Sequence, residues 1–521
     1  MKNKTKATME RVQSFQYKLI LEGIGVGILT GLVVSLFRLA LEKAEFYRNS
    51  VLSIARESMG WIFVAIGIWM ISYIVVWFSY RKEPLCSGSG IPQVKGELKG
   101  QIEQRWYTII PAKFIGGVFA IGSGLSMGRE GPSIQLGAMV GKGFSKLGKK
   151  LRTEEKMLMT CGAGAGLSGA FCAPLAGVVF SLEELHKNFS TEVLLSTMAA
   201  SVASDFVASY IFGLNPVFDL TVEGRLPLSR YWMVICLGLI LGVFGVFYNK
   251  VTAWVQDLYD KIGRKSVKMM IPFILLIPLA IMYPMALGSG HHLVSEIAGG
   301  EFALGAVMLL LVMKFVFSII CFGSGAPGGI FLPLLVLGAI TGGAFAEGIG
   351  GLIGYEEPYI AYFVILGMTG YFSAIVRAPI TGVILITEMT GDFKNFLALA
   401  VVALVAYIVA DLLNGKPIYD QLMYRMLSKD SDYGRTDEIK NKKVLIDSDV
   451  YIGSLMDGEE IEHMLLPKGC LVVSVQRDGR EVVPNGATVL KGGDKLVVLC
   501  TEGYLNTVEE KLDFICHRIK N

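Results

Sequence analysis

The chain is poor in charged residues. Only 18% of its 521 residues are Asp, Glu, Lys or Arg, and 53% are hydrophobic. A typical soluble domain is about a quarter charged. The formal net charge of +3 is small and gives no indication of a nucleic-acid partner. The scarcity of charge therefore excludes an ordinary soluble domain and indicates a protein of the lipid bilayer.

Several kinds of chemical motif are also missing. The eight cysteines are scattered, with no CxxC pair, so we expect neither a disulfide framework nor a cysteine metal site. No HExxH occurs, and the adjacent His291 and His292 have no further ligand at metal spacing. "GAMVGKG" (137–143) lacks the spacing of a phosphate-binding loop, and "GAGLSG" (164–169) follows no strand and is better explained by close helix packing. We therefore expect no cofactor, no metal and no enzyme activity.

Long apolar runs are abundant. Residues 19–37 and 61–78 are each long enough to cross about 30 Å of hydrocarbon as a helix. Similar runs continue to about residue 413, which predicts a polytopic α-helical membrane protein. The polar, basic residues 1–18 are expected to form a cytoplasmic segment before the first span. The run behind them is too long for the core of a signal peptide.

Glycine and proline interrupt many of these runs. Interrupted apolar segments occur at 110–126, 133–145, 157–182, 327–349 and 360–390. Such segments predict half-helices that end inside the membrane, where surrounding protein or a water-filled cavity satisfies the freed backbone.

The sequence contains an internal repeat. "GSG" at 88–90 recurs at 288–290, "GSGLSMGREGPSIQLGA" from Gly122 aligns with "GSGAPGGIFLPLLVLGA" from Gly323, and "APLAGVVFSLEE" from Ala173 aligns with "APITGVILITEM" from Ala378. Three matches in the same order predict two homologous halves, at about 15–210 and 225–413. Paired broken segments in two halves are typical of transporters that bind their substrate near the membrane midplane.

The repeat separates duplicated glutamates from single ones. Glu130 aligns with Phe331, and Glu184 aligns with a methionine, so neither carboxylate is copied. Glu183 is copied as Glu388. We therefore interpret Glu183 and Glu388 as structural, and Glu130 and Glu184 as functional.

Three glycine-rich loops precede helical segments: "GSGIP" (88–92), "GREGP" (128–132) and "GGIFLP" (328–333). Backbone N–H groups and helix N-termini in such loops make an anion site without a full positive charge, and Ser89 adds a hydroxyl donor. A site of neutral donors suits a small anion that must also leave. The carboxylate of Glu130 can itself occupy such a site and loses this attraction when protonated, which would couple anion occupancy to a proton.

In this order, the three loops resemble the signature loops of CLC chloride channels and chloride/proton antiporters. "APLAGVVFSLEE", "VRAPITGVILITEMT" (376–390) and "NGKPIYDQL" (414–422) are also similar to segments of that family, and the resemblance covers about residues 15–427. It implies the CLC fold, with two inverted-topology halves and broken helices within a transmembrane domain at 19–427. It also implies a homodimer with one ion path per subunit, in a prokaryotic inner or plasma membrane with both termini cytoplasmic.

The resemblance also assigns roles to residues. It implies that chloride is held by the Ser89 hydroxyl, the Tyr419 phenol and the backbone N–H groups of Ile330 and Phe331. The supporting loop backbone is that of Gly88, Gly90, Gly128, Gly131 and Gly329.

The two unpaired glutamates match the proton-handling positions of the antiporters. Glu130 matches the outer gating glutamate and Glu184 the inner proton-transfer glutamate. Glu184 favours a chloride/proton antiporter, and a passive voltage- or pH-gated chloride channel on the same fold is the alternative. Ser89 favours chloride over nitrate. A membrane-embedded enzyme or a receptor has no catalytic constellation to support it.

The character of the chain changes near residue 428. Residues 428–443 read as a polar linker, and 444–521 as a small α+β domain. Within it "CLVVSVQ" (470–476) and "EVVP" predict a hairpin with an Asp-Gly turn, "DKLVVLC" (494–500) a strand, and residues 457–466 a short helix. The domain resembles the TrkA-C (RCK C-terminal) family rather than a CBS pair. That resemblance implies a dimerising regulatory module, some of whose members bind small ligands, cyclic di-AMP among them.

Overall fold

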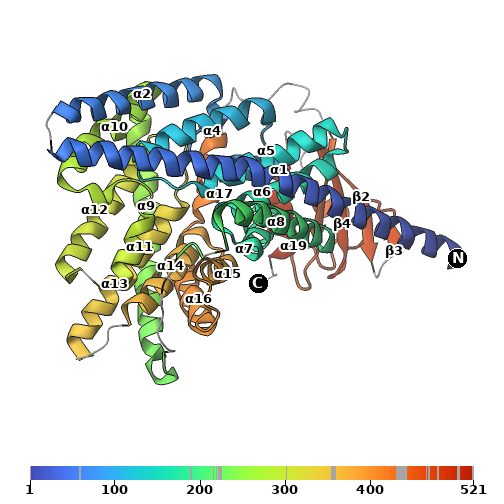
Figure 1. Cartoon of the computed structure of the whole chain (residues 1–521). Helices are drawn as coiled ribbons and strands as arrows, with labels where there is room; N and C mark the ends of the chain where they lie inside the picture. The colour runs from blue at the N-terminus through green and yellow to red at the C-terminus, as the bar shows by residue number, and fades with distance from the viewer. Residues whose placement is uncertain are drawn as a thin grey trace. The chain divides into compact units, whose positions relative to one another are not determined.

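The protein forms two compact units, Met1–Leu427 and Ser428–Asn521. Their structure, a computed structural model, describes residues 2–57, 60–187, 190–214, 216–218, 220, 226–300, 302–353, 359–429, 443–464, 466, 470–477, 480–501 and 505–518. The first unit is helical and the second contains a sheet (Figure 1).

The first half of the helical unit consists of helices joined by short turns. They are α1 (Lys2–Glu57), α2 (Gly60–Lys82), η1 (Pro84–Cys86), α3 (Ile91–Leu98), α4 (Trp106–Gly122), α5 (Glu130–Leu147), α6 (Arg152–Phe171), α7 (Pro174–Phe180), the π-helical turn η2 (Ser181–His186) and α8 (Thr191–Phe212).

The second half repeats this order. Its elements are η3 (Leu228–Arg230), α9 (Tyr231–Lys261), α10 (Lys265–Met282), η4 (Pro284–Ala286), α11 (His291–Ala298), α12 (Leu304–Gly323), α13 (Phe331–Ile353), α14 (Ile360–Val376), α15 (Pro379–Thr390) and α16 (Phe396–Leu412). The helix α17 (Ile418–Lys429) follows.

The repeat in the sequence is a repeat in the backbone. Helices α3 to α8 correspond in order to α11 to α16. The two Gly-Ser-Gly loops, 88–90 and 288–290, are called the serine loops. Their glycines take the same left-handed angles, with φ of 60° and 94° at Gly88 and Gly90, and of 67° and 84° at Gly288 and Gly290. Only glycine adopts these angles at little cost, which explains why "GSG" is duplicated.

The predicted breaks within the apolar segments are present. Helices α6 and α14 are followed by Cys172 and Arg377, which both take left-handed backbone angles (φ 52° and 69°) and cap the helix ends. In each case an Ala-Pro pair follows and begins the next short helix. Proline cannot continue a helix but suits its first turn, so the duplicated "AP" fixes the break in both halves.

The first helix is longer than its apolar run. Helix α1 is continuous from Lys2 to Glu57, so residues 2–18 of the polar segment predicted at 1–18 belong to the same helix. Its apolar part is Tyr17–Ala55, one of seven helices in the described chain that are long and apolar enough to cross a membrane. Helix α1 packs along α8, α6 and α2 (Figure 1).

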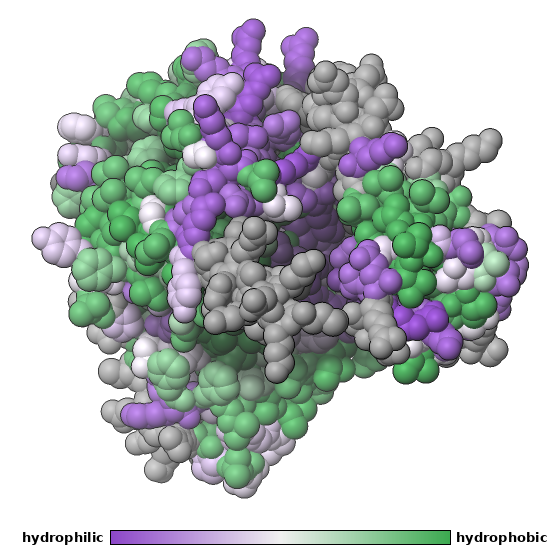
Figure 2. Space-filling view, turned by 90° about the vertical axis from the view of Figure 1, so that its right-hand side faces the viewer, coloured by the Kyte–Doolittle hydropathy of each residue, from purple (hydrophilic) through white to green (hydrophobic). Residues whose placement is uncertain are grey.

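The surface of the helical unit is apolar over wide areas. Figure 2 shows broad hydrophobic areas on the face it draws, with hydrophilic residues gathered between them. Large side chains such as Phe63 on α2 and Phe206 on α8 are 77% and 74% exposed. Exposed apolar side chains of this size are favourable against lipid and costly against water.

Glycines allow the central helices to pack closely. A Cβ atom on Gly137 of α5 would collide with the carbonyl oxygen of Gly162 on α6, and one on Gly338 of α13 would collide with that of Gly367 on α14. Gly166, within the predicted packing motif at 164–169, likewise lies directly against the backbone of Ser133. Small residues permit this approach of helix backbones in membranes.

The second unit contains a four-stranded antiparallel sheet with strand order β1-β4-β2-β3. Its elements are β1 (Lys443–Asp449), η5 (Ile461–Met464), β2 (Leu471–Arg477), β3 (Arg480–Val482), β4 (Lys495–Thr501) and the helix α19 (Leu505–His517). The predicted hairpin is confirmed by the pairing of β2 with β3, and the predicted strand at 494–500 by β4.

Other expectations for this unit need correction. The helix predicted at 457–466 is wrong: the described part of that segment holds only the single 3-10 turn Ile461–Met464, preceded by a bridge between Glu460 and Val489. Of the predicted linker 428–443, residues 430–442 lie outside the described chain.

A buried ion pair stabilises the sheet. Arg477 on β2 donates from Nε and Nη2 to the two carboxylate oxygens of Asp494, at 2.8 and 2.6 Å. The Asp494 side chain is 1% exposed. Burial alone would raise the pKa of Asp494, but the hydrogen bonds from Arg477 and from the Lys491 backbone N–H hold it below its ordinary value.

Candidate functional site

The three glycine-rich loops meet inside the helical unit. Gly128 and Gly329 exchange two backbone hydrogen bonds, of 2.7 and 2.8 Å. Gly328 N–H donates to the Gly88 carbonyl at 3.0 Å, and Gly88 N–H donates to that of Gly325 at 3.2 Å. Loops that are far apart in the sequence therefore form one continuous backbone structure.

Ser89 lies at the start of α3 and is buried, with 2% exposure. Its hydroxyl has no hydrogen-bond partner among the described residues. Gly131, in the first turn of α5, lies against Ser89, because a Cβ atom there would collide with the Ser89 hydroxyl oxygen and would lie 2.6 Å from its carbonyl oxygen. A buried hydroxyl without a partner costs about 1–3 kcal/mol, so this donor is suited to a ligand that accepts a hydrogen bond.

Tyr419 in the first turn of α17 is fully buried, and its hydroxyl likewise has no hydrogen-bond partner in the described chain. The charges of both Glu184 and Glu130 act on its phenol. Tyr419 is therefore near both glutamates that the repeat singled out.

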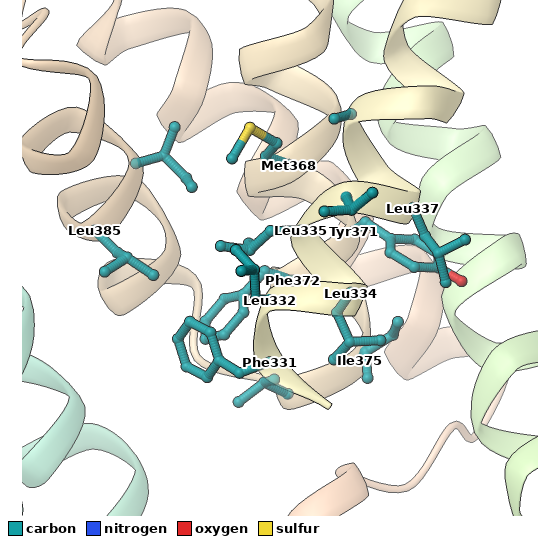
Figure 3. Packing of buried hydrophobic residues seen from close by; sticks show 14 of the residues in the cluster. Phe331, Leu332, Leu334, Leu335, Leu337, Met368, Tyr371, Phe372, Ile375 and Leu385 are labelled. Carbon is teal, nitrogen blue, oxygen red and sulfur yellow. The ribbon is translucent and has the colours of Figure 1, made fainter. Parts of the chain in front are cut away.

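The N-terminus of α13 carries the predicted backbone donors. Ile330 accepts the first helical hydrogen bond, from Leu334 at 2.9 Å, and Phe331 is the first helical residue. N–H groups at such a position have no acceptor within the helix. The Phe331 ring packs against Phe372 of α14, with ring centroids 4.8 Å apart, and this fixes the backbone direction there (Figure 3).

Glu130 is the first residue of α5 and is fully buried. Neither of its carboxylate oxygens makes a hydrogen bond of normal geometry within the part of the chain that the structure describes. The backbone N–H groups of Arg129, Glu130 and Leu332 nevertheless face it. Gly128 leaves room for it, since a Cβ there would collide with the carboxylate. The carboxylate therefore lies between the positive ends of α5 and α13.

Arg129 is not the partner of Glu130 in an ion pair. Its guanidinium contacts Glu42 of α1, with 3.9 Å between Nη1 and Oε1. Adjacent residues at a helix start point in different directions, which explains this separation.

Glu184, in the turn η2, is paired with a buried lysine. Lys95 of α3 donates to Glu184 Oε1 at 2.6 Å and contacts Asp420 Oδ1 of α17 at 2.5 Å. The Lys95 side chain is fully buried and that of Glu184 is 4% exposed. Lys187, half-exposed, reaches the other oxygen of Asp420 at 3.2 Å. Glu184 is thus held in a network of two lysines and two carboxylates.

These features agree with what known proteins show. A family model described as voltage gated chloride channel matches residues 71–411. The chain belongs to the voltage-gated chloride channel (CLC) family. A second family model, the TrkA-C domain, matches residues 445–513. Both results confirm the families that the sequence predicts, and the first confirms the CLC fold.

Relatives and solved structures of the CLC family cover most of the chain. The H(+)/Cl(-) exchange transporter ClcA of Vibrio cholerae (strain O395) is 36% identical over 417 residues, 77% of this chain and 88% of that protein. That of Vibrio parahaemolyticus is 34% identical over 420 residues, 78% and 89% of the two chains. A slow cyanobacterial Cl-/H+ antiporter has a similar structure, with a TM-score of 0.75, 32% identity and coverage of 79% and 98%. A CLC-type fluoride/proton antiporter shares the fold, with a TM-score of 0.64 at 22% identity and coverage of 77% and 97%.

In this CLC chain the duplicated glutamates clasp the two halves together. Glu183 accepts from the backbone N–H of Ile380 at 3.3 Å and of Thr381 at 2.8 Å, at the start of α15. Glu388 accepts from the N–H of Leu175 at 3.0 Å and of Ala176 at 2.7 Å, at the start of α7. Each half therefore caps a helix of the other, which agrees with their structural interpretation.

The sequence analysis missed a second duplicated pair. Lys113 of α4 donates to the carbonyls of Cys86 and Gly88, at 2.9 and 2.6 Å. Lys314 of α12 donates in the same way to the carbonyls of Ala286 and Gly288, at 3.1 and 2.7 Å. Gly288 is the first residue of the second Gly-Ser-Gly loop, 288–290. Both lysines are fully buried and fix the carbonyls of the serine loops. Their separation of 201 residues equals the repeat offset, which would have revealed them.

The sequence analysis also did not identify Lys95 and Asp420 as parts of the site. Lys95 belongs to an otherwise ordinary helical stretch, and Asp420 directly follows Tyr419. Neither has a distinctive motif, because their partnership depends on how α3 and α17 pack.

Proposed function

We propose that this protein exchanges chloride for protons across a membrane. The observation that carries the proposal is the position of Glu130, a fully buried carboxylate between the N-termini of two half-helices. An anion site that contains its own protonatable anion links anion movement to protonation. The relatives named as H(+)/Cl(-) exchange transporters support the same proposal.

Chloride would be bound by neutral donors: the Ser89 hydroxyl, the Tyr419 phenol and the backbone N–H groups of Ile330 and Phe331. Two of these four donors are buried hydroxyls with no partner in the described chain. The site contains no direct lysine or arginine ligand, so bound chloride can also leave. The backbone of Gly88, Gly90, Gly128, Gly131 and Gly329 holds the donors in place.

Protons would be carried by Glu130 and Glu184 in turn. As a carboxylate, Glu130 occupies the anion position at the start of α5. When protonated it loses its attraction for the helix N-termini, and chloride takes its place. Glu184 would exchange protons with the inner solution, and Tyr419 is near enough for the charges of both glutamates to act on it.

The test measures reversal potentials of the protein in liposomes under opposed chloride and proton gradients. An exchanger responds to both gradients, whereas a passive chloride channel, the alternative on this fold, ignores the pH gradient. Glu130→Gln should still conduct chloride but transport no protons. If Glu130→Gln still drives protons with a chloride gradient, Glu130 is not the coupling residue.

We also propose the setting in which this exchange occurs. The chain would be a homodimer in a prokaryotic inner or plasma membrane, with one ion path per subunit and both termini in the cytoplasm. The TrkA-C unit would act as a regulatory module, and cyclic di-AMP is the candidate ligand. A rise in the melting temperature of the full-length protein on addition of cyclic di-AMP would support this role, and no change with any nucleotide would leave the unit a dimerisation module only.

A further inference from the structure

Glu184 faces a buried positive charge, which creates a problem for proton uptake. The ammonium of Lys95 is fully buried and donates to Glu184 at 2.6 Å. If Glu184 takes up a proton, this pair ceases to be an ion pair. A buried ammonium without a counter-ion is strongly unfavourable, so the pairing opposes protonation of Glu184 and acts against the burial of the carboxyl, which favours its neutral form.

Asp420 removes this obstacle. Its Oδ1 lies 2.5 Å from the same Lys95 Nζ that contacts Glu184. Lys95 therefore keeps one carboxylate partner when Glu184 is neutral. Asp420 also contacts Lys187, whose side chain is 48% exposed. The groups that act on Glu184 are thus Lys95 from α3, Asp420 from α17 and Lys187 beyond η2.

The same contacts connect the two elements that carry the hydroxyl donors. Lys95 lies on α3, whose N-cap Gly90 follows Ser89, and Asp420 directly follows Tyr419 on α17. The Lys95–Asp420 contact therefore joins the two elements next to the proposed hydroxyl donors.

We propose that Asp420 is a positioning residue for proton loading: it remains the counter-ion of Lys95 while Glu184 takes up and releases its proton. This inference rests on the proposed role of Glu184 in proton transfer. With both carboxylates ionised the two lysines are neutralised, and one proton on Glu184 leaves a single positive charge at the solvent-facing end of the network. No bond other than the O–H bond of Glu184 forms or breaks.

Lys95 and Asp420 should affect proton transport with opposite sign. Without Asp420, the charge of Lys95 acts on Glu184 alone and disfavours its protonation. Without Lys95, Asp420 and Glu184 become two close carboxylates that favour a shared proton. One charge at this distance shifts a titration by about one pH unit or more.

The experiment measures proton and chloride fluxes of the full-length protein in liposomes at a series of internal pH values. For Asp420→Asn we expect the pH profile of proton transport to shift down by about one unit, and for Lys95→Met to shift up by a similar amount. The double variant should lie between them. Asp420→Glu keeps the charge and should keep the parent profile.

Two further measurements make the result decisive. Lys187→Met leaves the buried pair intact and should give a smaller upward shift, which tests the network even if a buried variant fails to fold. Chloride binding measured by calorimetry reports folding for each variant. A merely structural role would change chloride binding and both fluxes together without moving the pH profile.

The outcomes separate this inference from the proposed function. If Glu184→Gln transports protons like the parent, the proposed role of Glu184 fails and the inference fails with it. If Glu184→Gln loses proton transport but Asp420→Asn and Lys95→Met shift the profile in the same direction, or not at all, only the inference is overturned.

Discussion

Gly131→Ala should disrupt chloride binding without altering any side chain that binds the ion. Gly131 is helical, in the first turn of α5, so alanine fits its backbone angles. The added Cβ would collide first with the Ser89 hydroxyl oxygen, and it would also lie 2.6 Å from the Ser89 carbonyl oxygen, where ordinary contact begins at 3.4 Å. The Ser89 loop must therefore move back by at least about 0.8 Å, the difference between the two carbonyl distances, and its hydroxyl must turn away from the new methyl group.

The loop cannot make this movement freely. The Gly88 carbonyl accepts from Lys113 at 2.6 Å and from Gly328 N–H at 3.0 Å, so a shift strains both hydrogen bonds. The Ser89 hydroxyl would no longer point correctly at a bound anion. Loss of one hydrogen bond to a charged ligand costs about 1.5–3 kcal/mol, so the dissociation constant for chloride should rise by about 10- to 100-fold.

Isothermal titration of chloride into the purified protein measures this effect. Gly348→Ala on α13 is the matched control, because no atom lies within 4 Å of the added Cβ. An unchanged chloride affinity in folded Gly131→Ala would show that Ser89 does not bind the ion.

Three further predictions concern the carboxylate of Glu130, the helix cap made by Glu183 across the two halves, and the Arg477–Asp494 ion pair of the sheet. In Gly128→Ala the nearest atom to the new Cβ is the flexible carboxylate end of Glu130, so we expect it to be displaced, with chloride flux retained and fewer protons moved per chloride; unchanged coupling in liposomes would contradict this. Glu183→Ala should lower the free energy of unfolding by about 1–2 kcal/mol through loss of a helix cap, visible as a lower melting temperature in detergent, and an unchanged melting temperature would refute the clasp. Arg477→Leu should destabilise the TrkA-C unit by about 2 kcal/mol at pH 7. Because the folded pKa of Asp494 is depressed, this difference should shrink as the pH falls below about 4 in denaturant titrations, and a pH-independent difference would exclude the ion pair as its cause.

The broken helices and loop glycines were predictable because their backbone chemistry is local. "GSG" needs left-handed angles that only glycine adopts cheaply, and Ala-Pro ends one helix and starts the next. Comparison of the two halves of the sequence also distinguishes Glu130 from Glu183. The repeat provides this information because duplicated residues serve the common scaffold and unique ones do not.

Other features depended on packing or on weak local signals. The ion pairs of Lys95 join helices that no sequence pattern brings together. Helix α1 extends to Lys2 because residues 2–18 contain neither glycine nor proline, so their polarity does not mark a boundary. In the segment 457–466 the polar pattern suggested a helix, but bridge pairing of Glu460 and hydrogen bonds with the 486–490 chain hold most of it extended or turned.

The reciprocal bonds between the halves have a mechanical consequence. Gly128 and Gly329 bind each other in both directions, and Glu183 and Glu388 cap helices across the same divide. Rocking one half against the other, the movement by which many repeat-built transporters alternate, would break all these bonds at once. The two halves are therefore held rigidly against each other. Exchange in this protein must then proceed through small displacements of side chains such as Glu130, without movement of one half relative to the other.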